Sequence, residues 1–276
     1  MPERSASRTA EGVAVIRAAH QLLDAPPPLV DDPIAPALLT PGGTDVLRTA
    51  PERFRTLGAL RLRSHILLRS RYAEDRLAAA VARGVRQYVQ LGAGFETFAY
   101  RQPSWAAPLR IFEVDHPATQ SVKRARLADA GIVVPPNVSF APIDFEAEGL
   151  EAGLARHGVR LDEPLFCSWL GVTMYLTADA VHAVLASMAR RAPSSEIVFT
   201  FATPLAEGES QISVAAAAVG EPWQTFFEPD ALAGMLRELG FTQVTLLDPA
   251  EAETRYFKGR TDLPPPRRTT IVSAIV

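Results

Sequence analysis

The spacing of apolar residues along the chain changes near Gly84. Before this position, apolar residues recur every three or four positions, which is the period of one face of a helix. The pattern predicts helices at about residues 9–23 and 57–83, the first ended by three consecutive prolines and the second by Gly84. Between them, Thr49 and Glu52 have the spacing of a capping box, which predicts that a helix begins there.

After Gly84, short apolar runs alternate with helical stretches. The predicted strands lie at residues 85–91, 110–115, 138–143, 165–170, 197–201, 243–247 and 269–276. Helices are predicted at about residues 117–130, 151–156, 177–190 and 229–239. This alternation indicates an α/β fold with a doubly wound, mostly parallel sheet, and the last two strands, which lack a helical crossover, indicate an antiparallel pair at its end. We expect one structural unit, with an N-terminal helical cap (residues 1–84) packed on a core (residues 85–276).

Composition and charge narrow the class of protein. The 276 residues include 28 Lys plus Arg and 31 Asp plus Glu, so a net charge of −3 gives no field that attracts nucleic acid or an anionic membrane. No apolar run is long enough to cross a bilayer, and the first residues lack the pattern of a signal peptide. A single cysteine excludes an internal disulfide and a cysteine zinc cluster, and no histidine spacing suggests a metal site. We expect a cytoplasmic protein without partners among nucleic acids or membranes.

A glycine-rich turn follows the first predicted strand, where Gly92, Ala93 and Gly94 lead into a short helix. Glycines let backbone amides approach a ligand closely, and the start of a helix offers unpaired donors. A dinucleotide-binding fingerprint would have its third glycine at position 97, where this chain has Thr97. The turn therefore indicates a ligand site, and Thr97 weighs against the alternative of an NAD-type oxidoreductase.

Acidic residues end the second and third predicted strands. Asp115 lies about 20 residues after the turn, where a carboxylate can accept hydrogen bonds from both ribose hydroxyls of an adenosine. Its alternative role is to cap the helix that Pro117 opens. Asp144 either accepts a hydrogen bond from an adenine amino group or caps the next helix. The pattern favours a ligand that contains adenosine.

Four motifs in this order carry a family resemblance. They are Leu-Gly-Ala-Gly-Phe-Glu-Thr-Phe-Ala-Tyr-Arg from position 91, Phe-Glu-Val-Asp-His-Pro from 112, Ile-Asp-Phe from 143 and Gly-Val-Thr-Met-Tyr-Leu-Thr from 171. Together they resemble the leucine carboxyl methyltransferase family, which belongs to the class I S-adenosylmethionine-dependent methyltransferases. The resemblance covers roughly residues 9–260. It implies a Rossmann-like sheet of seven strands with a reversed last strand, and S-adenosyl-L-methionine as cofactor.

The resemblance also implies roles for single residues. The glycine turn, Gly92 to Gly94 with Ala93, would approach the methionine moiety of the cofactor. Asp115, next to His116, would hold the ribose. Asp144 and Phe145 would frame the adenine.

An arginine is expected for the cofactor's carboxylate, because a guanidinium keeps its proton and can bind a carboxylate through two hydrogen bonds. Arg69 and Arg71 both match the family's arginine segment ahead of the first strand, and Arg71 is the predicted ligand. At the end of the fourth strand, Leu170 stands where the family has an acidic residue. Leu170 therefore borders the cofactor without a charge, and the cofactor's amino group would use backbone carbonyls.

Tyr175, just past the fourth strand, is predicted to orient the methyl acceptor, although a tyrosine half-buried at a helix start is an equal alternative. The resemblance implies an O-methyltransferase whose acceptor is a carboxylate, or a hydroxyl, of a small molecule or peptide. A carboxylate is already ionised at neutral pH, whereas a hydroxyl needs a base. The histidines considered for that role are His20, His65, His116 and His182, and none is predicted to be catalytic. A non-catalytic protein that binds an adenosine ligand remains the further alternative, because Leu170 removes a polar contact.

Overall fold

One sheet of seven strands organises the protein in the computed structural model, which describes residues 7–143, 149–204, 211–218 and 220–276. The strands are β1 (Gln87–Leu91), β2 (Arg110–Asp115), β3 (Val138–Pro142), β4 (Leu165–Trp169), β5 (Glu196–Thr200), β6 (Gln243–Leu246) and β7 (Ile271–Ile275). Their order is β3-β2-β1-β4-β5-β7-β6, and only β7 runs antiparallel to its neighbours. The predicted fold class, with its reversed last strand, is confirmed.

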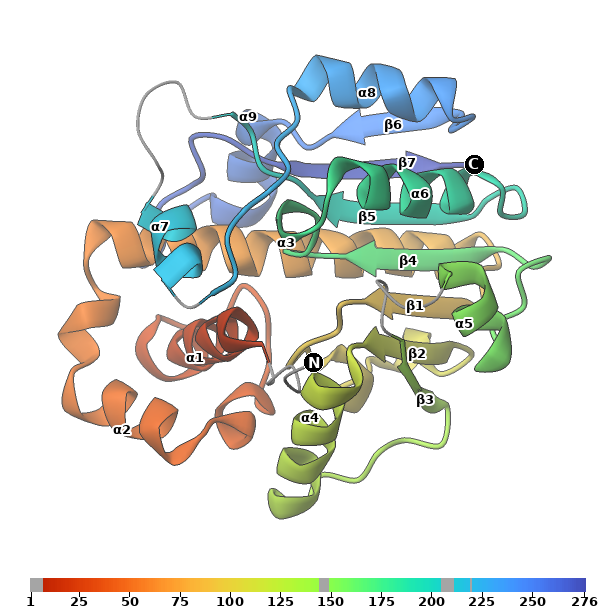
Figure 1. The fold of residues 1–276 in the computed structure, drawn as a ribbon. Coiled ribbons are helices and arrows are strands. Elements are labelled where there is room, and N and C mark those ends of the chain that lie inside the picture. The colour runs from red at the N-terminus through yellow and green to blue at the C-terminus, as the bar shows by residue number, and fades with distance from the viewer. Residues whose placement is uncertain (1–6, 144–148, 205–210, 219) are drawn as a thin grey trace.

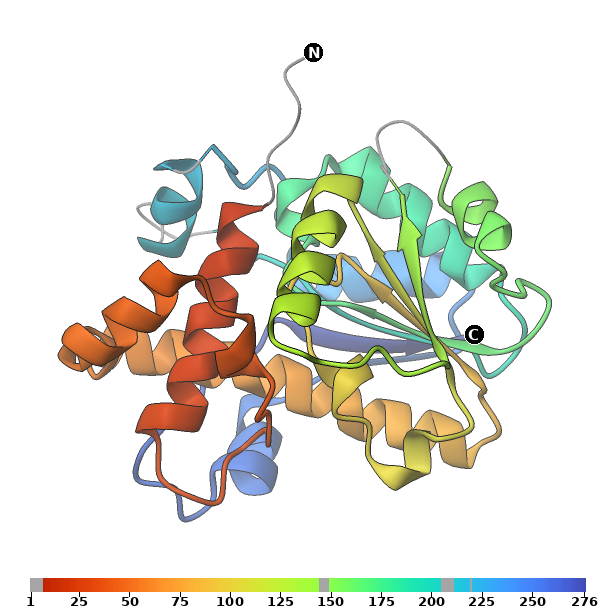
Figure 2. The same cartoon turned by 90° about the horizontal axis from the view of Figure 1, so that it is seen from below.

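Helices cover both faces of the sheet (Figures 1 and 2). One face packs on α5 (Leu150–Arg156), α6 (Ala178–Ala189) and α8 (Pro229–Glu238), and the other packs on the long helix α3 (Leu57–Ala82). Successive residues of a strand point to opposite faces, so Tyr88 belongs to the α3 core while Val89 belongs to the other. Helix α4 (Pro117–Asp129) follows β2 and begins at Pro117, as predicted.

The N-terminal helices lie beyond the carboxyl ends of the parallel strands. Figure 1 shows α1 (Arg8–Leu23) and α2 (Pro41–Thr49) in this position, and α3 runs past the strand ends to reach them. The part of α3 beside the sheet shares one apolar core with it, in which Leu68 and Leu77 are fully buried with Phe166 of β4. The division of the chain at residue 84 stays a prediction.

Two local predictions were wrong. Thr49 does not begin a helix, because it is the last residue of α2. This helix starts at Pro41 and is capped by Thr40, and Pro51 prevents it from continuing. The cap of α3 is Thr56, whose hydroxyl accepts a hydrogen bond from the amide of Ala59. The glycine turn leads into a short 3₁₀ turn (Phe98–Tyr100) instead of an α-helix.

Other helical segments escaped prediction. These are α7 (Gln211–Ala218), α9 (Pro249–Ala252) and the π-helical turn Glu253–Phe257, the last two between β6 and β7. Along the described part of the chain, every helix is too short or too polar to cross a membrane. The predicted adenine-binding residues, Asp144 and Phe145, lie outside the described residues.

Candidate functional site

A cavity of about 900 Å³ opens at the carboxyl ends of β1, β2 and β4. The strand order changes direction between β1 and β4, which is where open α/β sheets bind their ligands. Helices α1 and α3 and residues 220–224 form the remaining walls. A cavity of this size lies near the upper end of the range of about 300–1,000 Å³ that is usual for ligand sites, so it can hold a cofactor together with a small second molecule.

The glycine turn lines this cavity, and its backbone is shaped by two left-handed residues. Gly92 has φ of +66° and Gly94 has φ of +46°. A Cβ atom on Gly92 would lie 2.4 Å from Val172 Cγ2, so a larger residue does not fit there. The amides of Gly92 and Ala93 both donate to Val114 O, and that of Gly94 donates to the carboxylate of Asp115. The backbone of the turn therefore forms a wall of the cavity. Its amides donate to groups of the protein, whereas the sequence predicted the free donors of a helix start.

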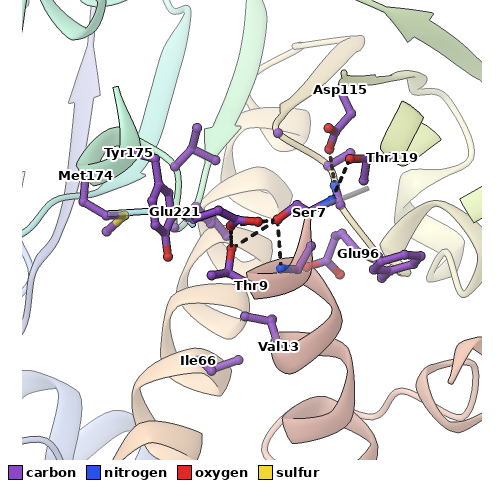
Figure 3. Close-up of a pocket in the computed structure, with 18 of the residues that line it drawn as sticks. Ser7, Thr9, Val13, Ile66, Glu96, Asp115, Thr119, Met174, Tyr175 and Glu221 are labelled. Carbon is purple, nitrogen blue, oxygen red and sulfur yellow. Dashed lines mark hydrogen bonds between the residues drawn. The ribbon is translucent and has the colours of Figure 1, made fainter. Parts of the chain in front are cut away.

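Asp115 faces the cavity at the end of β2 (Figure 3). Its Oδ1 accepts from the His116 amide at 2.7 Å and its Oδ2 from the Gly94 amide at 2.5 Å. Burial raises the pKa of Asp115 above its ordinary value, while the two amides act in the opposite direction. Each carboxylate oxygen keeps a second lone pair for a ligand hydroxyl. His116 also lines the cavity, and its Nδ1 accepts from the Ala118 amide at the start of α4.

The two arginines of the predicted pair lie on different faces of α3. Arg71 pairs with Asp75 at 2.9 Å, its side chain is 46% exposed, and it does not line the cavity, so its prediction as a site residue is not met. Arg69 does line it. Its guanidinium lies against Gly171, where a Cβ would be 2.5 Å from Arg69 Nη1. Burial, and then the charge of Arg17, lower the pKa of Arg69 to about 10. Among the described residues, Arg69 has no hydrogen-bond or ion-pair partner.

A buried ionic network, which the sequence did not reveal, holds α1 against the glycine turn. Arg17 of α1 binds Asp32 at 2.7 Å and also the carboxylate of Glu96. The same guanidinium donates to the hydroxyls of Ser70 on α3 and Thr97. Because Glu96 and Thr97 directly follow the turn, this network fixes the turn relative to α1 and α3.

Gln90 is a second residue that the sequence did not mark. It precedes the glycine turn on β1, lines the cavity and is 2% exposed. Neither Oε1 nor Nε2 of its side-chain amide has a hydrogen-bond partner in the described part of the chain. A buried amide without partners costs stability unless a ligand supplies them, so Gln90 points to a polar ligand group.

The residues after β4 form the opposite side of the cavity. Leu170 lines it, whereas Trp169 is 1% exposed and packs on Phe199 in the core. Tyr175 and Met174 also line it, and Figure 3 shows them on the far side from Asp115.

The start of α1 lines the cavity next to residues 220–224. The carboxylate of Glu221 accepts hydrogen bonds from the Ser7 hydroxyl at 3.1 Å, the Arg8 amide at 2.8 Å and the Thr9 hydroxyl (Figure 3). The amide of Ser7 donates to the hydroxyl of Thr119 on α4 at 3.3 Å. These contacts, the Glu221 clasp, join three separate segments of the chain at the cavity.

Known proteins with similar sequences are methyltransferases by name. A protein of Bacillus subtilis called "Putative S-adenosyl-L-methionine-dependent methyltransferase YktD" is 32% identical over 225 residues, which cover 78% of this chain and 74% of that protein. A protein of Frankia alni with the same description is 32% identical over 253 residues, 90% of this chain and 87% of its own length.

Comparison of structures gives the same fold. The crystal structure of "a putative methyltransferase" from Thermobifida fusca matches with a TM-score of 0.56 at 16% identity, covering 98% of this chain and 94% of that one. The family model described as Leucine carboxyl methyltransferase matches residues 10–189, a span that includes the glycine turn, Asp115 and Tyr175. The chain therefore belongs to the leucine carboxyl methyltransferase family of S-adenosyl-L-methionine-dependent methyltransferases.

Proposed function

We propose that the protein is an O-methyltransferase that transfers the methyl group of S-adenosyl-L-methionine to a carboxylate or hydroxyl oxygen of a small molecule or peptide. The observation that carries this proposal is that one cavity contains both the carboxylate of Asp115 and the unpartnered guanidinium of Arg69. The cofactor has a ribose diol at one end and an amino-acid carboxylate at the other, which are the complements of these two groups.

The described residues fit this cofactor. Asp115 would accept from the ribose hydroxyls, and Arg69 would bind the carboxylate. Gln90 Oε1 would accept from the α-ammonium group, a contact that no acidic side chain provides at Leu170. The close backbone wall at Gly92 would leave room for the methionine chain. When bound, the cofactor supplies a methyl group on a positively charged sulfur, ready for in-line displacement.

The protein's own contribution to such a reaction is alignment and exclusion of water. The Glu221 clasp would retain the cofactor beneath α1. The Arg17 network would keep the glycine turn in place. The phenol of Tyr175, on the side of the cavity away from Asp115, would orient the acceptor oxygen. If the chain divides at residue 84, the part before it would supply the cavity walls from α1 and α3, and the part after it would supply the strand ends.

Calorimetric titration with S-adenosylhomocysteine, the demethylated cofactor, tests the proposal. We expect it to bind the wild-type protein, whereas NADH should not. Asp115→Ala should weaken binding at least tenfold, because both ribose hydroxyls lose a charged acceptor. Asp230→Ala, an exposed aspartate at the start of α8, is the matched control and should bind as the wild type does. Binding of NADH alone, or an unchanged affinity in Asp115→Ala, contradicts the proposal.

A further inference from the structure

The charges that line the cavity restrict what the methyl acceptor can be. Three arginines of the described chain line it: Arg8, Arg17 and Arg69. Arg8 is exposed at the start of α1, and Arg17 is neutralised by Asp32 and Glu96. Arg69 is the cation left for a ligand, and it lies against Gly171 at the end of β4. On the proposed function, the carboxylate of the cofactor occupies it.

A carboxylate acceptor would then be the second anion in the cavity, and apart from the sulfonium of the cofactor it would meet no further buried cation of the described chain. Removing an ionised carboxylate from water without a countercharge costs far more than removing a hydroxyl. Of the positions outside the described residues, 144–148, 205–210 and 219 contain no lysine or arginine, and residues 1–6 contain one, Arg4. The charge balance of the described cavity lining therefore favours an uncharged acceptor.

Part of the cavity wall is apolar. Helix α3 runs past the strand ends (Figure 1), so each turn before Arg69 carries its side chains about 5.4 Å farther from the sheet. Apolar or aromatic side chains from α1, α3 and the segments after β4 and α7 line the cavity: Val13, Leu62, Ile66, Met174, Tyr175 and Trp223. These residues, the apolar chamber, suit a hydrocarbon skeleton.

One titratable side chain lies in the wall of this chamber. His65 is one helical turn before Arg69 on the same face of α3, lines the cavity, and has no hydrogen-bond partner among the described residues. Burial, and then the nearby charge of Arg69, lower the pKa of His65 to about 4. Its ring is therefore neutral at pH 7 in the free protein, and one ring nitrogen is free to accept a proton.

We propose that the natural acceptor is a hydroxyl group, phenolic or alcoholic, on an apolar skeleton, and that His65 accepts the proton of this hydroxyl during methyl transfer. The inference rests on the function proposed above. The hydroxyl oxygen forms a bond to the methyl carbon, and the electron pair of the broken carbon–sulfur bond stays on sulfur. The hydroxyl proton passes to the free nitrogen of His65 and then to solvent. A weak base is sufficient, because an oxygen that has gained a methyl group releases its proton readily.

Two probes that differ in one group test the acceptor class: 2-naphthol and 2-naphthoate. Each is titrated into the protein already saturated with S-adenosylhomocysteine, so the same experiment first establishes that the cofactor site works. We expect 2-naphthol to bind at least tenfold more tightly than 2-naphthoate. If S-adenosylhomocysteine does not bind, the proposed function fails. If it binds but 2-naphthoate binds equally or more tightly, or neither probe binds, only the present inference fails.

The role of His65 is tested by methyl transfer from labelled S-adenosylmethionine to 2-naphthol. We expect a base-stable methyl ether, and no label in 2-naphthoate. Removing a general base typically costs a factor of about 10² or more in rate, so His65→Leu and His65→Gln should both lower kcat by about that factor.

His65→Gln keeps a hydrogen-bond acceptor and should leave the KM for 2-naphthol within about threefold of the wild type. In both variants the affinity for S-adenosylhomocysteine should be unchanged. His182→Gln, an exposed histidine on α6, is the matched control. A kcat unchanged in His65→Gln, transfer to 2-naphthoate, or transfer to neither probe overturns the inference.

Discussion

Replacing Arg69 should have opposite effects on ligand affinity and on the stability of the free protein. Arg69 is charged and without a partner among the described residues. A pKa of about 10 corresponds to a cost of about 3 kcal/mol for keeping the guanidinium charged in the folded state. Arg69→Met preserves much of the side-chain volume and removes this cost. The free variant should therefore be at least as stable as the wild type.

Cofactor affinity should change in the other direction. Truncating one partner of a buried, hydrogen-bonded charge pair costs about 2–5 kcal/mol, so Arg69→Met should weaken S-adenosylhomocysteine binding at least thirtyfold. Binding of 5′-methylthioadenosine should be unaffected, because this compound has the adenosine and the sulfur but lacks the amino-acid part. The comparison of the two ligands locates the effect at the amino-acid part of the cofactor.

Arg71→Met is the matched control on the same helix. Its partner is Asp75 at 2.9 Å, and both side chains are exposed enough that the pair is worth no more than about 1 kcal/mol. This variant should bind both ligands as the wild type does. Calorimetric titration gives the affinities and thermal unfolding gives the stabilities. The reasoning is refuted if Arg69→Met binds S-adenosylhomocysteine normally, or if it loses both ligands alike.

Three further predictions concern the walls of the cavity. Gly92→Ala should destabilise the protein by about 2–4 kcal/mol in urea unfolding, because its φ is +66° and its Cβ would meet Val172; Val172→Ala in the same chain should restore part of the loss. Gln90→Leu should leave the free protein as stable or more so, yet weaken S-adenosylhomocysteine about tenfold and spare 5′-methylthioadenosine; equal losses for both ligands would contradict the contact with the ammonium group. Burial opposes ionisation of Glu96, but Arg17 and Arg101 outweigh it and lower the pKa of Glu96 to about 2. Its stabilisation is complete above the pKa of an ordinary glutamate and is lost as pH falls from about 4.5 to 2, so Arg17→Met should reduce this acid dependence of the unfolding free energy.

The sheet could be predicted because its signals are local. Each strand is a short apolar run between turn residues, and the order of strands and helices fixes the class of fold. The position of Asp115 at the end of a strand could be predicted in the same way, and this residue lines the cavity. The α-helix expected after Gly94 was wrong, because the chain there instead engages its amides with Val114 and Asp115.

The choice between Arg69 and Arg71 shows where a local pattern is insufficient. Residues two apart on a helix point to nearly opposite sides, and α3 has apolar residues on more than one face, so the pattern does not tell which side meets the cavity. A signal was nevertheless present. Arg71 has Asp75 four residues later, the spacing of an exposed ion pair, whereas Arg69 has Ala73 there. The partners of Arg17, in contrast, come from residues distant in sequence and required the folded chain.

These contacts make the N-terminal helices part of the site. Helix α3 supplies Arg69, and Arg17 of α1 reaches Glu96 just after the glycine turn. The first residues of α1 also meet Glu221, far along the chain. A shift of α1 would therefore disturb the glycine turn and break the contacts with Glu221 at the same time. One helix thus contacts both the glycine turn and the Glu221 segment, and the ion pairs of Arg17 with fixed partners set one position of α1 more narrowly than apolar contacts alone would.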